Sequence, residues 1–494
     1  MTTHACDLVL RGGRVLDPET GRDEVADVAV LDGTVVAVVA AGDCSEVHLV
    51  AHEEVDVSGA VVAPGWIDLH SHAQSVAGSR LQAHDGVTTA LDLEAGTVEV
   101  ERWYADVAAA GRAIGYGTSA SWQISRMIHV GGIEVGGPEQ ALAFFGDQRW
   151  QAEARPEQTA ALLARVEAEL AQGALGVGML QGYGPRIDPE EYLAVSRVAA
   201  SAGVATFTHA RDLVEQLPGV PVDGAEEIVR AAGETGVRAH YCHVNSSSSR
   251  LVDRVHRLIE ASAAPVTTEA YPYGAGATPI SADFLSPDRL ARRGLTPSSL
   301  VYAPTGRRVA DVAELLRLRA QDPGGIAIVH LLDEEVAADR EVLDRCLTFP
   351  GTVVASDAMP LAWAAERSDP YAWPPPGGTP LHPRTAGTYS RFWRRYVREL
   401  GVVSPLEAVR RCSLGPARVL EPSAPAMRRK GRLQVGADAD LVVLDLDRVT
   451  DRSTYADGTR TSTGYRLVVV DGTVVVRDDM LVLDALPGQA VRAG

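Results

Sequence analysis

Two histidines, His70 and His72, stand two residues apart at the end of the apolar run Ala63-Pro-Gly-Trp-Ile-Asp-Leu. Such a run is typical of a buried strand. Side chains two apart on an extended strand point to the same side, so both imidazoles face one way. Imidazole is a common ligand of zinc and of similar divalent ions. The pair therefore predicts half of a metal site; the alternative is two surface or core histidines that bind no metal.

Further histidines and carboxylates follow later apolar segments in the same manner. These residues are Glu94 after Leu91-Asp-Leu, His209 after Val204-Ala-Thr-Phe-Thr, His243 after Arg238-Ala-His-Tyr-Cys, and Asp357 after Val353-Val-Ala-Ser. Four imidazoles with one or two carboxylates suit Zn²⁺, as one ion or two, or another divalent metal. In a hydrolytic site the ion lowers the pKa of a bound water towards about 7, and Asp357 would accept and deliver the proton. His240 falls on the opposite strand face from His243 and is expected to be structural.

The composition is that of an ordinary soluble protein. Of 494 residues, 46% are hydrophobic and 22% charged, and the formal net charge is −19. This charge argues against nucleic acid and anionic membranes as partners, and no apolar run approaches the length of a membrane span. The five cysteines form no C-x-x-C pair, so neither a disulfide framework nor a zinc finger is expected. A cytoplasmic protein is predicted, and a homo-oligomer is compatible with this composition.

The two ends of the chain are both rich in valine and contain Asp-Gly turns. Residues 1–62 and 426–494 are expected to form antiparallel hairpins that pair into one small β-sandwich domain. Between them, residues 63–425 alternate apolar strands with helical segments, which favours a (β/α)₈ barrel over an open parallel sheet. The expected helices are 157–172, 189–202, 225–236 and 251–261, and the expected strands include 86–93, 175–178, 204–208, 238–243, 266–270 and 352–356.

A barrel places functional residues at the carboxyl ends of its strands, where all the candidate ligands fall. Residues 277–325 are irregular and rich in Ser-Pro and Ala-Pro steps. An insertion of this length after a barrel strand is interpreted as a lid over the site. The alternative is a decorative or interface insertion.

With these residues in view, the chain resembles a known group of enzymes. Pro64-Gly-x-Ile-Asp-x-His-x-His, two later single histidines, a final Ser-Asp and Gly431-Arg-Leu-x-x-Gly-Ala-Asp-Ala-Asp resemble the amidohydrolase superfamily. Within it, Glu269-Ala-Tyr-Pro-Tyr-Gly-Ala-Gly and His382-Pro-Arg-Thr-Ala-Gly resemble N-acyl-D-amino-acid deacylases of the D-aminoacylase and N-acyl-D-glutamate deacylase type. The resemblance covers nearly the whole chain.

The resemblance implies cleavage of a linear amide whose product carries an α-carboxylate. Arg384 and Tyr271 would hold that carboxylate, and a guanidinium is suited to a two-pronged ion pair. Tyr271 could also donate to the developing oxyanion. Ala277 stands where these deacylases have a serine, so a carboxylate contact is lost or passes to Thr278.

The chain also departs from the pattern at its metal centre. Deacylases of this type use a cysteine thiolate from the second strand, where this chain has Glu94. Other amidohydrolases bridge two metals with a carboxylated lysine, but the single lysine of this chain, Lys430, lies far from the candidate ligands. Glu94 is therefore expected to replace both, as an anionic ligand or bridge.

Other polar residues give weaker signals. Arg126 and His129 are expected in a loop after a strand, where Arg126 could contact substrate or simply lie on the surface. Asn245 could hydrogen-bond a substrate or cap the following helix. His330 ends a strand that could belong to the insertion.

Three functions fit these observations. The leading hypothesis is a metal-dependent hydrolase of a linear, carboxylate-bearing amide. A cyclic amide hydrolase of the dihydropyrimidinase or hydantoinase type is the nearest rival, opposed by the missing bridging lysine and by the His-Pro-Arg motif. A non-catalytic metal-binding barrel that serves as an interaction protein is the third.

Overall fold

The computed structural model describes residues 2–40, 47–361 and 363–494, and its centre is a parallel eight-stranded barrel. The barrel strands are β6 (Trp66–Asp68), β7 (Val87–Thr97), β8 (Gly115–Ser121), β9 (Gly176–Met179), β10 (Ala205–Thr208), β11 (Arg238–Tyr241), β12 (Val266–Ala270) and β17 (Val353–Val354). They are hydrogen-bonded in this order. A parallel bridge between Ser71 and Ala358 joins the segments after the first and last strands. The predicted barrel is confirmed.

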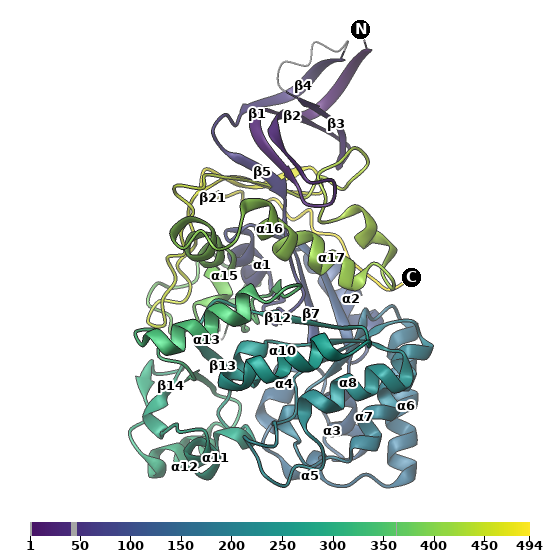
Figure 1. Ribbon diagram of the computed structural model, residues 1–494, viewed down its shortest axis with the longest axis vertical. Coiled ribbons are helices and arrows are strands. Elements are labelled where there is room, and N and C mark those ends of the chain that lie inside the picture. The colour runs from purple at the N-terminus through teal and green to yellow at the C-terminus, as the bar shows by residue number, and fades with distance from the viewer. Residues whose placement is uncertain (1, 41–46, 362) are drawn as a thin grey trace.

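Helices surround the barrel (Figure 1). The longer ones are α1 (Val76–Ala83), α2 (Val100–Ala110), α3 (Trp122–His129), α6 (Pro156–Ala171), α7 (Pro189–Ser201), α8 (Gly224–Thr235), α10 (Val252–Ala261), α13 (Ala337–Thr348) and α15 (Arg384–Phe392). The four helices expected from the sequence begin and end within one or two residues of their predicted positions. Local chemistry fixes their starts, since the Asp188 and Asp223 carboxylates accept backbone N–H groups at the first turns of α7 and α8.

Shorter helical segments connect these elements. They are α4 (Pro138–Ala141), α5 (Gln148–Gln151), α9 (Val244–Ser247), α14 (Ala364–Ser368), α16 (Pro405–Val409) and α17 (Gly415–Leu420). Of these, α4 and the turn after it, Leu142–Phe144, border the mouth of the barrel.

The two ends of the chain form one nine-stranded sheet, seen at the top of Figure 1. Its strands are β1 (Thr2–Asp17), β2 (Arg22–Leu31), β3 (Thr34–Ala40), β4 (Val47–Asp56), β5 (Val61–Pro64), β18 (Leu441–Leu444), β19 (Tyr465–Val470), β20 (Thr473–Arg477) and β21 (Met480–Leu481). Antiparallel pairing of β5 with β18 joins the two ends. Asp32 and Gly33 both adopt positive φ, as a tight hairpin turn requires. The expected β-rich domain built from both termini is thus present.

The insertion after β12 has regular structure of its own, at the lower left of Figure 1. It contains β13 (Ala275–Pro279), α11 (Pro287–Arg292), β14 (Leu300–Tyr302), β15 (Arg307–Arg308), α12 (Val312–Gln321) and β16 (Ile326–His330). The four strands form a separate sheet in the order β13-β16-β14-β15. His330 therefore belongs to the insertion. Its residues Phe284, Leu285 and Leu290 line the cavity at the barrel mouth; a lid function of the insertion stays a prediction. No helix in the described ranges is long and apolar enough to cross a membrane.

Candidate active site and metal centre

The six predicted ligands meet at the carboxyl-terminal rim of the barrel. They form two groups, His70–His72–Asp357 and Glu94–His209–His243, and within each group the potential ligand atoms lie within 4.8 Å of one another. Glu94 belongs to β7, and the other five follow β6, β10, β11 and β17. The rim gathers them because parallel barrel strands all end on the same side.

Glu94 lies between the two groups. Its Oε1 is 2.6 Å from His243 Nε2 and 3.0 Å from His209 Nδ1. Its Oε2 is 3.2 Å from His70 Nε2. One carboxylate oxygen thus faces each group, which is the arrangement that a bridging anionic ligand needs.

His70 and His72 complete the first group with Asp357. Their Nε2 atoms are 3.1 Å apart, and Asp357 Oδ1 lies 3.5 Å from His70 Nε2 and 3.6 Å from His72 Nε2. The second ring nitrogen of His72 faces Asp92 at 3.1 Å. His72 therefore directs one nitrogen into the cluster and the other to a carboxylate outside it.

Two of the ligands have left-handed backbone conformations that non-glycine residues rarely adopt. The φ angle is 32° at His243 and 52° at Asp357. Such strain costs roughly 1–3 kcal/mol per residue and collects at functional sites. In both residues it turns the chain at a strand end so that the side chain points into the cluster.

The cluster keeps its carboxylates ionised. Burial alone would raise the pKa of Glu94, but His70, His243 and His209 hold it well below its usual value. Burial would also raise the pKa of Asp357. The positive charges of Arg384 and His70 outweigh this effect and lower the pKa of Asp357 below its usual value.

The histidines of the first group carry the balancing protons. Burial would lower the pKa of His72, yet Asp92 and Asp357 raise it to about 9. The His70 pKa is raised well above its usual value, because Glu94 and Asp357 outweigh burial. A divalent cation can replace these protons, since metal ligands must be deprotonated. The donor set, mixed imidazole and carboxylate, fits zinc or a similar borderline ion.

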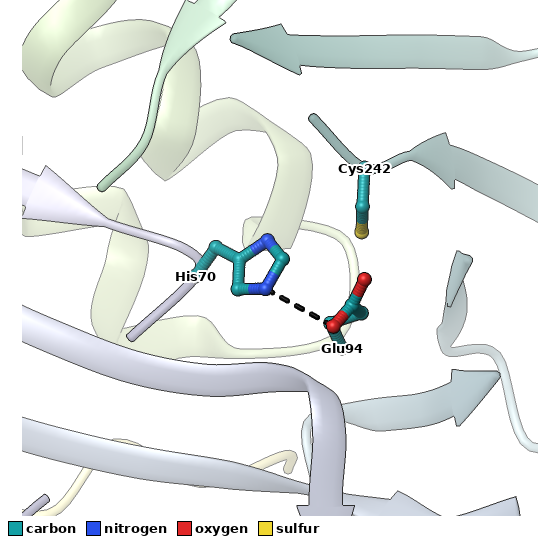
Figure 2. Close-up of side chains that lie close together, drawn as sticks. All are labelled: His70, Glu94 and Cys242. Atoms are coloured by element: carbon teal, nitrogen blue, oxygen red, sulfur yellow. Dashed lines mark ion pairs between the residues drawn. The ribbon is translucent and has the colours of Figure 1, made fainter. Parts of the chain in front are cut away.

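Cys242 is a member of the cluster that sequence reasoning missed. Its thiol lies with His70 and Glu94 in a third potential ligand group, all three side chains buried (Figure 2). Burial, reinforced by Glu269, raises the pKa of this thiol well above its usual value. The only signal in the sequence was its position directly before His243 at a strand end.

Three of the five predicted substrate-binding residues, Arg384, Tyr271 and Thr278, line a cavity of about 520 Å³ that also contains candidate metal ligands. Arg384 is fully buried, and its Nη2 donates to Asp357 Oδ1 at 2.9 Å. Its guanidinium carbon stands 4.7 Å from the centre of the Tyr271 ring. Nε and Nη1 of Arg384 and the Tyr271 hydroxyl have no hydrogen-bond partner in the part of the chain described. Thr278 also lines the cavity and shares a 2.9 Å hydrogen bond with Tyr183.

Arg126 requires a correction. It lies on helix α3, not in a loop, and it does not line the cavity. Its buried guanidinium pairs with Glu191, and its Nε donates to the Trp150 carbonyl at 2.7 Å. A guanidinium held in this way, with its donors satisfied inside the protein, has no route to substrate.

Asn245 also differs from its expected roles, since it neither caps a helix nor lines the cavity. Its Oδ1 accepts the Tyr271 N–H and its Nδ2 donates to the Tyr273 carbonyl, both at 3.3 Å. Asn245 therefore stabilises the backbone of the Tyr-Pro-Tyr segment and in this way helps to position Tyr271. His240, expected to be structural, is buried against Glu269.

Comparisons with known proteins agree with this geometry. The model of the amidohydrolase family matches residues 53–476. The chain belongs to the amidohydrolase family. It is 30% identical to the D-aminoacylase of Alcaligenes xylosoxydans xylosoxydans, over 95% of this chain and 94% of the relative. An N-acyl-D-glutamate deacylase of the same organism is 28% identical, over 95% and 93%. The expected enzyme class, a hydrolase of amide bonds, is confirmed.

Solved structures show the same fold. A D-aminoacylase structure matches with a TM-score of 0.75 and 22% identity, over 99% of this chain and 100% of that one. The zinc- and phosphonate-bound N-acyl-D-glutamate deacylase of Bordetella bronchiseptica gives 0.73 and 23%, over 99% and 100%. The L-hydantoinase of Arthrobacter aurescens, a dihydropyrimidinase, gives only 0.58 and 18%, over 99% and 100%. The deacylases thus share more of the architecture of this amidohydrolase than the cyclic amide hydrolase does.

Proposed function

We propose that this amidohydrolase deacylates an N-acyl-D-amino acid, releasing a carboxylic acid and the free amino acid. The observation that carries the proposal is the buried guanidinium of Arg384, which lies beside Asp357 and the other candidate metal ligands and has two nitrogens without a hydrogen-bond partner within the described ranges. A carboxylate held there would place the neighbouring amide at the ligands. The D-aminoacylase and N-acyl-D-glutamate deacylase relatives support the same chemistry.

We further propose zinc as the metal, in one or two ions. Glu94, His209 and His243 would hold one ion, and His70, His72 and Asp357 would line a second position, with Glu94 shared. When bound, such an ion lowers the pKa of a water and polarises the amide carbonyl. The zinc in the related N-acyl-D-glutamate deacylase structure favours this choice of metal.

The residues of this chain then have distinct tasks. Asp357 Oδ accepts the proton of the attacking water and returns it to the departing nitrogen. Arg384 supplies a fork of donors for the α-carboxylate. Tyr271, buried with a free hydroxyl, donates either to that carboxylate or to the carbonyl oxygen as negative charge develops there.

The cavity walls indicate the side chain of the substrate. Most of the wall away from the ligands is apolar: Leu142, Phe145, Leu180, Phe284, Leu285, Leu290, Leu295, Val329, Leu331, Met359 and Leu361. Arg293 reaches the cavity but pairs with Asp212 at 2.7 Å. An uncharged, apolar side chain therefore fits better than an acidic one.

A substrate screen of the zinc-loaded enzyme tests the proposal. N-acetyl-D-leucine, -methionine and -phenylalanine are expected to be hydrolysed faster than N-acetyl-D-glutamate, than the L-enantiomers, and than hydantoin or dihydrouracil. Chromatography measures the free amino acid released from the N-acetyl substrates and the ring-opened N-carbamoyl acid formed from the cyclic amides. If a cyclic amide is hydrolysed faster than the N-acetyl-D-amino acids, the proposed deacylase function is wrong and the cyclic amide hydrolase function is supported.

The rival cyclic amide function is disfavoured by the position of the lysine. Lys430 Nζ pairs with Asp440 at 2.6 Å and with Asp438 at 3.1 Å, beside the terminal sheet. It is thus committed elsewhere and cannot bridge metals at the rim. A non-catalytic barrel is opposed by the gathered candidate ligands together with Arg384, two of whose nitrogens have no hydrogen-bond partner among the described residues.

Arg384 offers a direct test of carboxylate recognition. Arg384→Met is expected to raise KM for an N-acetyl-D-amino acid by roughly 10–100-fold, since a charge-assisted hydrogen bond contributes about 1.5–3 kcal/mol. The matched control is the same substrate as its primary amide, which lacks the carboxylate. The native enzyme should discriminate against the amide and the variant should not. Equal discrimination by both proteins would remove Arg384 from this role.

A further inference from the structure

Glu269 is a buried carboxylate that the proposed chemistry does not use. It lies on β12, only 1% exposed, beneath the metal ligands. Its Oε1 is 2.5 Å from His70 Nδ1, and its Oε2 is 3.0 Å from His240 Nε2. Its Oε1 also accepts the backbone N–H of His243 at 3.3 Å. Within the described residues, all the hydrogen bonds of its carboxylate therefore go to histidines.

The contact with His70 decides which ring nitrogen is available for a metal. Figure 2 shows one ring nitrogen of His70, Nε2, facing Glu94, while the second nitrogen points away from Glu94. That second nitrogen, Nδ1, faces Glu269. A carboxylate accepts the hydrogen bond of the ring nitrogen that faces it, so Nδ1 is the donor, and Nε2, which faces Glu94, His72 and Asp357, is the nitrogen that a metal could bind.

The remaining contacts hold Glu269 itself in place and extend its reach. His240 Nε2 donates to Oε2, and the other nitrogen of His240 lies 2.7 Å from Thr267 Oγ1, which fixes the orientation of that ring. The bond to the His243 backbone lies where φ is 32°. Glu269 thus contacts a ligand from each metal-binding group, one through its ring and one through its strained backbone.

We propose that Glu269 is a positioning residue of the metal centre, fixing the tautomer and orientation of His70 and supporting the turn at His243. Glu269 is not among the residues that line the cavity. The inference rests on the proposed metal-binding role of the cluster, and not on which amide the enzyme cleaves. Partners of this kind typically contribute about 10–100-fold to metal affinity.

Metal affinity in a graded series of variants tests the inference. Zn²⁺ affinity of the full-length protein is measured by competition with a chromophoric chelator, and the absorption spectrum of the Co²⁺-loaded protein reports ligand geometry. Glu269→Ala is expected to lower the affinity for the more weakly bound Zn²⁺ ion by about 10–100-fold. Glu269→Gln keeps one acceptor for His70 and should lose less. His240→Ala leaves the His70 contact intact and should lose least.

A matched control separates positioning from general stability. Glu169 is a carboxylate that is also only 1% exposed, but it pairs with Arg165 and accepts the Val100 N–H at the start of α2. Glu169→Gln should lower the melting temperature without altering Zn²⁺ affinity or the Co²⁺ spectrum. If Glu269→Ala and Glu269→Gln, both folded, bind Zn²⁺ within twofold of the native protein, the inference is wrong.

The outcome is independent of the substrate screen. A graded loss of metal affinity in a protein that hydrolyses no N-acyl-D-amino acid would uphold the role of Glu269 and reject the proposed function. If the native protein hydrolyses such substrates but the Glu269 variants bind Zn²⁺ as tightly as it does, the proposed function is upheld and the role of Glu269 is rejected. Failure of the native protein to bind Zn²⁺ or Co²⁺ would overturn the inference.

Discussion

Asp357→Asn is expected to lower kcat by about 10³-fold while the protein still binds metal. General acid–base groups typically contribute 10²- to 10⁴-fold. Asparagine has nearly the same shape, and its oxygen can still accept from Arg384, which donates to Asp357 at 2.9 Å in the native enzyme. What it loses is the capacity to take a proton from water and return it to the leaving nitrogen.

The prediction is checked by steady-state hydrolysis and by metal analysis of the same preparation. Zinc should remain at the Glu94–His209–His243 group, which does not include Asp357. The melting temperature serves as the control for folding. Turnover within threefold of the native rate would exclude Asp357 as the proton carrier.

Glu94→Ala is expected to abolish turnover through loss of metal. Both Glu94 oxygens face ligands, one towards His243 and His209 and the other towards His70. Their removal deprives both groups of a shared anion. The loss of affinity should therefore exceed the roughly 10–100-fold that removal of an outer partner costs.

The two variants act as controls for each other. Both are expected to be inactive, but only Glu94→Ala should lose bound zinc, as measured by elemental analysis after dialysis. Glu94→Asp keeps the charge on a shorter arm and should retain more zinc than alanine. Full zinc stoichiometry in Glu94→Ala would show that Glu94 is not a ligand.

The larger features of this enzyme follow from its sequence. Strand–helix alternation predicts a parallel barrel, and parallel barrel strands bring their carboxyl ends to one rim whatever the intervening helices contain. For that reason His70, His72, Glu94, His209, His243 and Asp357 could be assigned to one cluster from their positions alone. The paired valine-rich ends and their Asp-Gly turns likewise predict the terminal β-domain, because turn chemistry and alternation are local properties.

The contacts that tune the site were decided by tertiary structure. The sequence allowed Arg126 to contact substrate. In the structure its guanidinium is buried and forms an ion pair with Glu191, which lies 65 residues further along the chain. Asn245 does not line the cavity; its side-chain oxygen accepts the backbone N–H of Tyr271 instead.

The same holds beneath the metal cluster. Glu269 orients His70 across 199 residues of sequence, and Cys242 joins the ligands by packing beside Glu94. Sequence spacing records which residues share a strand and a face. It carries no information on which distant side chain fills a given position in the barrel interior, since that depends on how closely packed side chains exclude one another.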